Sequence, residues 1–213
     1  MKLKQIIFEG PEACGKSTQL QLLSEYLDSS KIKYSITKEP GSGGILAAKI
    51  RNMLLDPETG KITEDAELLL INAARAELYK MHRSEEYRYH LQLKDRSFAS
   101  TRAYQGFGRE MDLDYIQTIT DHIVGDDLPK ILFLFDIDPI TGLKRAGARG
   151  KLDRFESEKL EFHKRVRRGY LSLTEHEKYK SITHLIDATR DINDIHKEIC
   201  QKVKQTFPEY NYK

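Results

Sequence analysis

The sequence predicts an α/β fold, a five-stranded parallel sheet wrapped by helices, and two observations predict it. Short apolar runs alternate with longer amphipathic stretches along the 213 residues, which is typical of parallel strands joined by helices. A glycine-rich loop, GPEACGKST at 10–18, directly follows the first apolar run, as in α/β proteins that bind phosphate groups. A chain of this length without repeats or low-complexity linkers predicts a single domain over residues 1–213.

The N-terminal half is predicted to contain two strands and three helices. Residues 5–9 form a short apolar run that leads into the glycine-rich loop. Beyond Lys16, Leu20, Leu23 and Leu27 recur at helical spacing. A turn containing three glycines, residues 38–44, separates the second strand from the next helix. The remaining predicted elements are a strand at 33–38 and helices at about 44–55 and 63–87.

The C-terminal half continues the alternation, and the run KILFLFDID at 130–138 is its strongest strand signal. A charged break at 149–155 interrupts the helical pattern. The other predicted elements are strands at 89–95 and 183–188 and helices at 109–124, 139–148, 156–178 and 191–206.

Composition excludes several classes of protein. The chain has 35 basic and 33 acidic residues, a net charge of +2, which argues against coating nucleic acid or an anionic membrane. The longest strongly apolar run, 131–135, is too short to span a membrane, and the N-terminus has no signal-peptide core. Cys14 and Cys200 lie far apart and have no metal-ligand spacing, which is typical of free thiols in a reducing cytosol. We therefore expect a cytoplasmic protein with no nucleic-acid or membrane partner.

The glycine-rich loop fits the pattern G-x-x-x-x-G-K-[ST] and follows a predicted strand, which makes it a phosphate-binding loop. Its successive backbone N–H groups and the start of the next helix would surround the phosphates of ATP. Lys16 would reach the β and γ oxygens, and Ser17 would hold Mg²⁺. The predicted ATP-binding residues of the loop are Gly10, Pro11, Glu12, Ala13, Cys14, Gly15, Lys16, Ser17 and Thr18.

Two residues of this loop are unusual, because Glu12 is an anion and Cys14 is a thiol beside the lysine. Cys14 has two interpretations that the sequence leaves open. The thiol either fills a small space, or the helix N-terminus lowers its pKa and makes it reactive.

The remaining pattern indicates a kinase of a small phosphorylated acceptor. No Asn is followed by Lys, so the base-reading motif of regulatory GTPases is missing. Six arginines lie at the end of the third predicted strand, on the two helices after the second strand or beside the charged break, where they would neutralise a phosphorylated acceptor. They are Arg51, Arg75, Arg96, Arg145, Arg149 and Arg154.

Six segments together resemble the bacterial type of thymidylate kinase, in both order and spacing. The resemblance spans nearly the whole chain, and AYQGFGR and RGKLDRFE are more specific than the phosphate-binding loop. The segments are FEGPEACGKST (8–18), KEPGSG (38–43), LLLINAAR (68–75), DRSFASTRAYQGFGR (95–109), LFDIDPITGLKRAGARGKLDRFE (134–156) and LIDA (185–188).

The resemblance implies a P-loop nucleoside-monophosphate kinase fold with a mobile lid at about 145–156. It implies transfer of the γ-phosphoryl group of ATP to dTMP, giving dTDP, with Mg²⁺ as cofactor and a homodimer as the assembly. In the lid, Arg145 would lie against adenine. Arg149 and Arg154 would reach the transferring phosphoryl group, because this chain has Ala13 in the loop where other members have a basic residue.

The resemblance also implies the remaining site residues. Arg96 would grip the acceptor phosphate, and Asp95 would orient Mg²⁺ through water. Glu12 would turn toward the acceptor sugar and accept a hydrogen bond from its 3′-hydroxyl, while Tyr104 would crowd the 2′ position. The implied catalytic residues are Lys16, Asp95, Arg96, Arg149 and Arg154. The other implied substrate-binding residues are Glu39, Pro40, Arg51, Ile71, Arg75, Thr101 and Gln105.

Some positions depart from the family pattern. Ile71 stands where a phenylalanine usually stacks on thymine, Lys38 replaces an arginine, and Ser97 follows the Asp-Arg pair. One alternative is therefore a kinase of another nucleotide or deoxynucleoside, such as dUMP or UMP, although Tyr104 argues against a ribonucleotide. A second alternative is a non-catalytic nucleotide-binding regulator, which the presence of the catalytic residues argues against. Asp136, at the end of the strongest strand, is expected to be structural.

Overall fold

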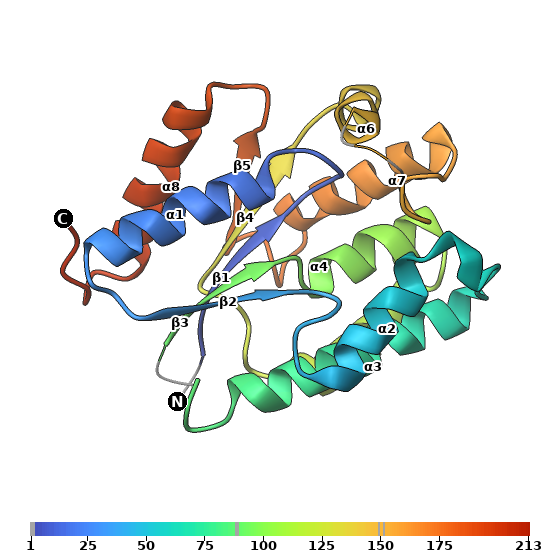
Figure 1. Cartoon of the computed structure of the whole chain (residues 1–213), viewed down its shortest axis with the longest axis horizontal. Coiled ribbons are helices and arrows are strands. Elements are labelled where there is room, and N and C mark those ends of the chain that lie inside the picture. The colour runs from blue at the N-terminus through green and yellow to red at the C-terminus, as the bar shows by residue number, and fades with distance from the viewer. Residues whose placement is uncertain (1–2, 88–89, 149, 151) are drawn as a thin grey trace.

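The computed structural model describes residues 3–87, 90–148, 150 and 152–213. A parallel sheet of five strands lies between two layers of helices in this part of the chain (Figure 1). The order of the strands is β2-β3-β1-β4-β5, and all four pairings are parallel. The strands are β1 (Lys4–Glu9), β2 (Tyr34–Lys38), β3 (Leu91–Asp95), β4 (Ile131–Asp136) and β5 (Thr183–Asp187). The predicted fold class and all five strands are confirmed, each strand to within two residues at either end.

Helices connect the strands and cover both faces of the sheet. None of those in the described residues combines the length and the apolar composition needed to cross a membrane. The α-helices are α1 (Lys16–Ser29), α2 (Ile45–Leu55), α3 (Glu64–His82), α4 (Phe98–Thr101), α5 (Leu113–Val124), α6 (Pro139–Gly147), α7 (Leu160–Leu171) and α8 (Ile192–Thr206). The other helical turns are η1 (Pro57–Thr59), η2 (Arg102–Gly108) and η3 (Ser172–Thr174).

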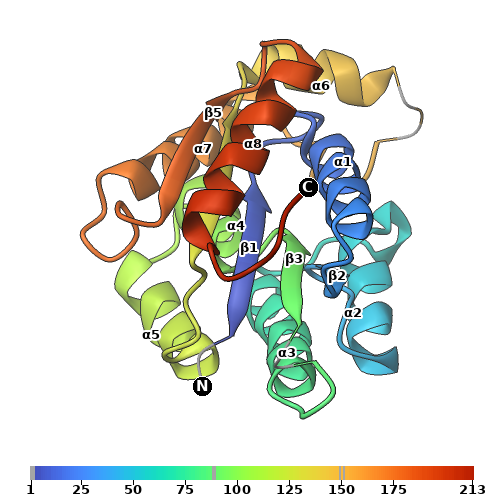
Figure 2. The same cartoon turned by 90° about the vertical axis from the view of Figure 1, so that its left-hand side faces the viewer.

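The alternation of side chains along β1 builds the two halves of the core. Ile6 and Phe8 point to the face covered by α1 and α8, while Ile7 points to the face covered by α3, α5 and α7. Figure 2 shows α1 and α8 together on one side of β1. Each such fully buried side chain contributes roughly 1.5–3 kcal/mol to stability. The apolar central strands are thus explained by burial on both faces.

The strand order determines where the site forms. Because β1 lies between β3 and β4, the chain leaves the sheet in opposite directions on either side of β1, and ligands of open α/β sheets bind at this point. The register pairs Phe8 with Asp95 and Glu9 with Leu134. The glycine-rich loop after β1 and the Asp95-Arg96 pair after β3 therefore emerge side by side.

Three predicted helices have different ends in the structure. The helix predicted at 156–178 covers only Leu160–Leu171, and the one at 63–87 ends at His82. Asp153 accepts hydrogen bonds from the backbone N–H groups of Phe155 and Glu156, and this turn precedes α7. The helix predicted at 109–124 begins at Leu113, because Asp112 caps its first turn. Local side-chain bonds of this kind compete with helix formation.

The sequence analysis did not predict the helical segment at 98–108, which ends in the π-helical turns of η2. Glycines allow η2 and α7 to approach closely. A Cβ atom on Gly108 would lie 2.6 Å from the Phe162 ring, and one on Gly169 would lie 2.8 Å from the Cα of Ala103. This close packing holds η2, which carries Tyr104 and Gln105, against α7.

An ion pair is buried beneath the sheet edge. Lys94 is fully buried on β3, and its Nζ lies 2.7 Å from Glu39 and 4.3 Å from the centre of the Tyr79 ring. Burial opposes ionisation of both groups. The mutual attraction outweighs it, so the pKa of Lys94 is raised and that of Glu39 is lowered. Both groups stay charged, and Glu39 is fixed at the end of β2.

His82 packs near this pair with both ring nitrogens lacking a hydrogen-bond partner among the described residues. Burial, together with the charge of Lys94, lowers the pKa of His82 to about 3 from an ordinary value of 6.5. The neutral ring is therefore the form that folding stabilises. The contribution of neutral His82 to the free energy of unfolding is complete above pH 6.5 and is lost as the pH falls toward 3.

We predict that lowering the pH from 7 to 5 costs roughly 2 kcal/mol of unfolding free energy through His82 alone. The His82→Phe variant should lose this part of the pH dependence, because phenylalanine has no proton to bind. Urea unfolding of both proteins at pH 7, 6 and 5 measures the difference. Equal pH slopes for the two proteins would contradict the prediction.

Candidate active site

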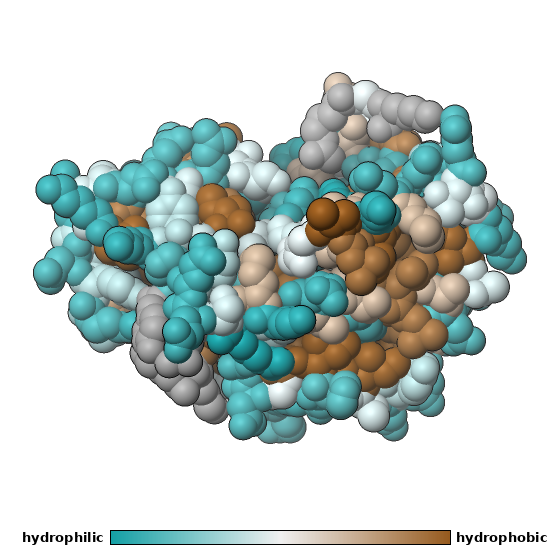
Figure 3. Space-filling model, turned by 60° about the horizontal axis from the view of Figure 1, so that its bottom comes forward, coloured by the Kyte–Doolittle hydropathy of each residue, from teal (hydrophilic) through white to brown (hydrophobic). Residues whose placement is uncertain are grey.

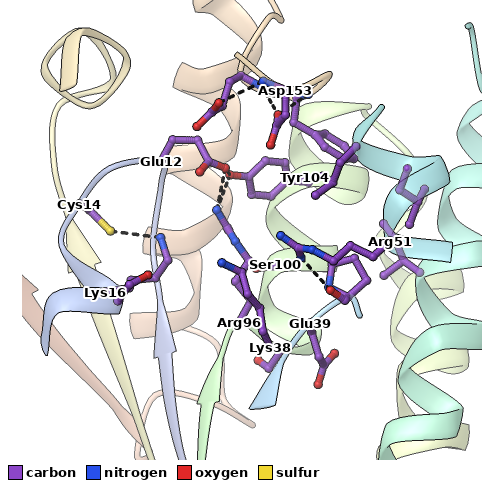
Figure 4. Close-up of a pocket in the computed structure, with 18 of the residues that line it drawn as sticks. Glu12, Cys14, Lys16, Lys38, Glu39, Arg51, Arg96, Ser100, Tyr104 and Asp153 are labelled. Atoms are coloured by element: carbon purple, nitrogen blue, oxygen red, sulfur yellow. Dashed lines mark hydrogen bonds and ion pairs between the residues drawn. The ribbon is translucent and has the colours of Figure 1, made fainter. Parts of the chain in front are cut away.

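A cavity of about 400 Å³ lies at the carboxyl edge of the sheet, above β1 and β3. The glycine-rich loop at 10–18, called the P-loop below, closes one side of the cavity, and α2, α3 and η2 close the other (Figure 4). Most of the site residues predicted from the sequence line it. They are Glu12, Ala13, Cys14, Gly15, Lys16, Ser17, Thr18, Glu39, Pro40, Arg51, Ile71, Arg75, Arg96, Thr101, Tyr104, Gln105 and Arg145.

The P-loop wraps around the ammonium group of Lys16. The Nζ atom of Lys16 donates to the carbonyl oxygens of Gly10 (2.9 Å) and Pro11 (2.7 Å) and lies 3.4 Å from the Cys14 sulfur. Gly10 has φ +144°, and a Cβ atom there would lie 2.3 Å from the Phe135 carbonyl oxygen. Only glycine therefore lets the loop pass over the end of β4. The N-terminus of α1 opens into the cavity, as anion binding requires.

Cys14 is 2% exposed. A reactive cysteine is partly exposed to solvent, so burial favours the interpretation that this thiol fills a small space in the loop. Cys14 and Cys200 are both free. Burial raises the pKa of Cys200 to about 11, which makes that thiol a poor nucleophile.

Glu12 turns away from the loop interior toward Arg96. Its Oε1 accepts hydrogen bonds from Arg96 Nη2 (2.6 Å) and from the Tyr104 hydroxyl (2.6 Å). Figure 4 shows these three side chains meeting in the centre of the cavity. Burial opposes ionisation of Glu12, but the charges of Arg96 and Lys16 outweigh it and lower its pKa to about 2. The carboxylate is thus ionised at neutral pH and fixes the Arg96 guanidinium.

A second carboxylate, Glu9, lies beneath Arg96 and was not predicted. It is fully buried at the end of β1. It accepts hydrogen bonds from the hydroxyl groups of Ser97, Ser100 and Tyr170. Burial raises its pKa above the ordinary value, although Arg96 acts in the opposite direction. Its only signal in the sequence is an acidic residue at the end of an apolar strand. Through Ser100 and Tyr170, which also bond Arg96 Nη1, Glu9 supports the second side of the guanidinium.

Asp95 and Ser17 lie together where the resemblance implies the metal. The Ser17 hydroxyl lies 3.4 Å from Asp95 Oδ2, and Lys38 Nζ lies 3.1 Å from the same oxygen. Asp95 Oδ1 is buried without a hydrogen-bond partner among the described residues. Burial opposes ionisation of Asp95, but neighbouring cations, Lys16 first, lower its pKa. A hydroxyl and an ionised carboxylate with a spare oxygen fit Mg²⁺, which prefers oxygen ligands and retains several waters.

Within the described residues, no group of three or more His, Cys, Asp or Glu side chains gathers to hold a metal ion. A cation at Asp95 and Ser17 would therefore depend on phosphate oxygens and water for its other ligands.

Arg75 is buried at the far side of the cavity, on α3. Nε donates to Glu39 (2.7 Å), Nη1 to Asn72 (2.8 Å), and Nη2 to the Thr101 hydroxyl (2.8 Å) and the Ser97 carbonyl (3.1 Å). The guanidinium is thus held rigidly, and Arg75 lines the cavity together with Ile71. Arg51 donates to the Pro40 carbonyl (2.7 Å) and lines the same wall.

The three lid arginines differ in position. Arg145 lines the cavity. Arg154 is directed away from the P-loop, because its Nε donates to the Leu54 carbonyl (2.7 Å) and its Nη2 to Glu67 (2.6 Å). Arg149 lies outside the described residues. Asp136, expected to be structural, forms a bidentate ion pair with Arg167 at 2.7 and 2.8 Å.

A P-loop and a set of fixed arginines share one cavity at the switch point of a parallel sheet. These features define the class of P-loop kinases that act on a small phosphorylated molecule. The sequence profile described as "Thymidylate kinase" matches residues 8–199. The chain therefore belongs to the thymidylate kinase family.

Individual relatives agree with this assignment. The chain is 40% identical over 187 residues to a thymidylate kinase of Carboxydothermus hydrogenoformans, which covers 85% of this chain and 89% of that protein. It is 38% identical over 201 residues to one of Deinococcus radiodurans, covering 94% and 96%. The crystal structure of thymidylate kinase from Ehrlichia chaffeensis superimposes with a TM-score of 0.74 at 29% identity, covering 96% of this chain and 99% of that one.

Proposed function

We propose that the chain is an ATP-dependent kinase that transfers the γ-phosphoryl group of ATP to dTMP and forms dTDP. The observation that carries the proposal is the Glu12–Arg96–Tyr104 arrangement, which separates a phosphate loop from an acceptor pocket in one cavity. Glu12 belongs to the P-loop by sequence, yet its carboxylate is part of the acceptor half. The family of the chain supports the same reaction. Because such an enzyme acts on free nucleotides, we place it in the cytoplasm.

The donor half binds ATP through the backbone. The N–H groups of residues 11–17 and the N-terminus of α1 hold the phosphates, and Lys16 exchanges its carbonyl partners for phosphate oxygens. Ser17 and Asp95 would hold Mg²⁺, which when bound neutralises charge on the β- and γ-phosphates. Arg145 lines the cavity where it can lie against adenine.

The acceptor half positions an anion for attack. Arg96, fixed by Glu12 and Tyr170, binds the acceptor phosphate, and its Nη groups would exchange some of their present partners for phosphate oxygens. The attacking phosphate oxygen is already anionic, so the reaction needs no strong general base. Catalysis therefore consists of positioning and of charge neutralisation.

Two side chains select the sugar and the base. The Tyr104 hydroxyl bonds Glu12 and fixes the buried ring, which would crowd a 2′-hydroxyl on the acceptor sugar. The remaining N–H of Arg75 is available to a carbonyl group of the base. Ile71 offers an aliphatic surface in place of an aromatic ring, and this keeps dUMP as the second candidate acceptor. The Phe155 ring lines the same cavity and supplies one aromatic surface.

Activity on a panel of acceptors tests the proposal. Purified protein with ATP and Mg²⁺ is offered dTMP, dUMP, UMP, dCMP, AMP and shikimate in turn, and ADP release is followed. We expect dTMP to have the highest kcat/KM, with UMP far below it because of Tyr104. A Lys16→Ala variant gives the background rate. A better acceptor than dTMP would refute the specific assignment, and no turnover with any acceptor would favour a regulator.

We further propose that Arg149 and Arg154 neutralise the transferring phosphoryl group. Arg154 must exchange Glu67 for phosphate to do so. Arg149→Ala and Arg154→Ala should each lower kcat for dTMP by roughly 10³-fold, as loss of an arginine finger does. Arg168→Ala, an exposed arginine on α7, is the matched control and should keep its rate. Near-normal turnover in both lid variants would contradict this role.

We also propose a homodimer that buries an apolar face of α3 and α5, two helices in contact. Leu69, Ala73 and Ala76 follow one another at helical spacing on α3 and are exposed, as is Tyr115 on α5. Figure 3 shows apolar side chains gathered on this lower side of the molecule. Patches of this kind mark interaction sites. Light scattering should give twice the 24.7 kDa mass of the chain, and a single-chain mass at micromolar concentration would contradict the dimer.

A further inference from the structure

A buried carboxylate on α3, Glu67, lies directly behind the cavity, and the mechanism above uses it only as the partner that Arg154 leaves. It is 1% exposed. Its Oε1 accepts hydrogen bonds from Gln105 Nε2 (2.7 Å) and Arg109 Nε (3.2 Å). Its Oε2 accepts from Arg109 Nη2 (3.2 Å) and Arg154 Nη2 (2.6 Å). Two guanidinium groups and one carboxamide thus converge on a single side chain.

This contact fixes the orientation of the Gln105 carboxamide. A carboxylate can only accept hydrogen bonds, and both oxygens of Glu67 face N–H donors of the guanidinium groups. The amide nitrogen of Gln105 must therefore face Glu67, and the carbonyl oxygen must face away from it. That assignment follows from the chemistry of the partner, whereas for most glutamines the two ends are hard to distinguish.

The carbonyl oxygen of Gln105 is left without a partner. Gln105 is 1% exposed and lines the cavity, and its Oε1 is buried with no hydrogen-bond partner among the described residues. Buried polar atoms are normally satisfied, so this oxygen is available to a donor on a ligand. Nearby, four of the five N–H groups of Arg75 have partners among the described residues, which leaves one donor.

We propose that Glu67 is a positioning residue that sets the base specificity of the acceptor site. By holding the amide nitrogen of Gln105, it offers the base one acceptor, the Gln105 carbonyl, beside one donor, the free N–H of Arg75. The inference rests on the proposed function, because it requires the acceptor base to occupy this cavity.

The proposed arrangement discriminates between pyrimidines by their hydrogen-bonding edges. Thymine and uracil present a ring N–H donor beside a carbonyl oxygen, which complements the acceptor and the donor of the pocket. Cytosine presents an unprotonated ring nitrogen beside an amino group, which is the opposite order. A cytosine would therefore place an acceptor against the Gln105 carbonyl. If Gln105 were free to turn over, this mismatch would disappear.

The Glu67→Gln variant tests the proposal. A carboxamide at position 67 can donate or accept, so it no longer dictates which end of Gln105 faces the cavity. We expect kcat/KM for dTMP to fall while that for dCMP stays constant or rises, so that the dTMP:dCMP ratio falls about tenfold or more. Arg154 also bonds Glu67, so the rate with every acceptor can change alike, and the dTMP:dCMP ratio is the readout. KM for ATP should stay within about twofold of the wild-type value.

Glu158→Gln is the matched control. Glu158 forms an ion pair with Arg109 Nη1 and, among the described residues, does not hydrogen-bond Gln105, so its loss should leave the dTMP:dCMP ratio unchanged. Glu67→Asp retains a group that only accepts and should preserve the ratio even where the rate falls. Gln105→Leu removes the carbonyl itself and should lower the ratio as Glu67→Gln does. It provides the test if Glu67→Gln does not fold.

Two results would overturn the inference. One is an unchanged dTMP:dCMP ratio in folded Glu67→Gln or in Gln105→Leu. The other is an equal fall in kcat/KM for dTMP, dCMP and ATP, which would indicate that the Glu67 carboxylate is merely structural. Failure of the proposed function is recognised separately, because in that case the wild-type protein itself would not phosphorylate dTMP.

Discussion

The ion pair between Glu12 and Arg96 joins the two halves of the site. Glu12 comes from the loop after β1 and Arg96 from the end of β3, and their side chains meet at 2.6 Å because these strands are neighbours. Arg96 adopts a left-handed backbone conformation with φ 71°, which costs roughly 1–2 kcal/mol for a residue with a Cβ atom. The backbone N–H of Arg96 donates to the Phe8 carbonyl at 3.0 Å. This hydrogen bond holds the strained turn beside β1.

The rest of the site depends on this pair. Tyr104 is fixed because its hydroxyl bonds Glu12, and Tyr170 and Ser100 are fixed because they bond both Arg96 and Glu9. The pKa values of the two carboxylates shift in opposite directions. That of Glu12 is lowered because it faces the guanidinium, and that of Glu9 is raised because it is fully buried beneath it. Glu12 also balances the charge of Arg96, so an incoming phosphate needs further cations. Lys38 and Arg51 are cations that line the same cavity.

The sequence was most informative where structure is local. The glycine pattern, Lys16 and the five strands could be predicted because each depends on residues close together in the chain. The resemblance placed Arg75, Thr101 and Gln105 in one site, and all three line the same cavity. Contacts over long separations could not be predicted. Glu67 and Gln105 are 38 residues apart, and Glu9 and Tyr170 are 161 apart. The start of the helix predicted at 156–178 depends on a turn made by Asp153.

The central claim is that Glu12, although part of the phosphate loop, serves the acceptor half. Calorimetric titration of wild-type protein and Glu12→Ala with dTMP and with ATP, each alone, tests it most directly. Loss of a charge-assisted contact to Arg96 should weaken dTMP binding by about tenfold or more, because the guanidinium loses its fixed position. The Kd for ATP should change by less than about twofold. An equal loss for both ligands, or tighter dTMP binding, would contradict the claim.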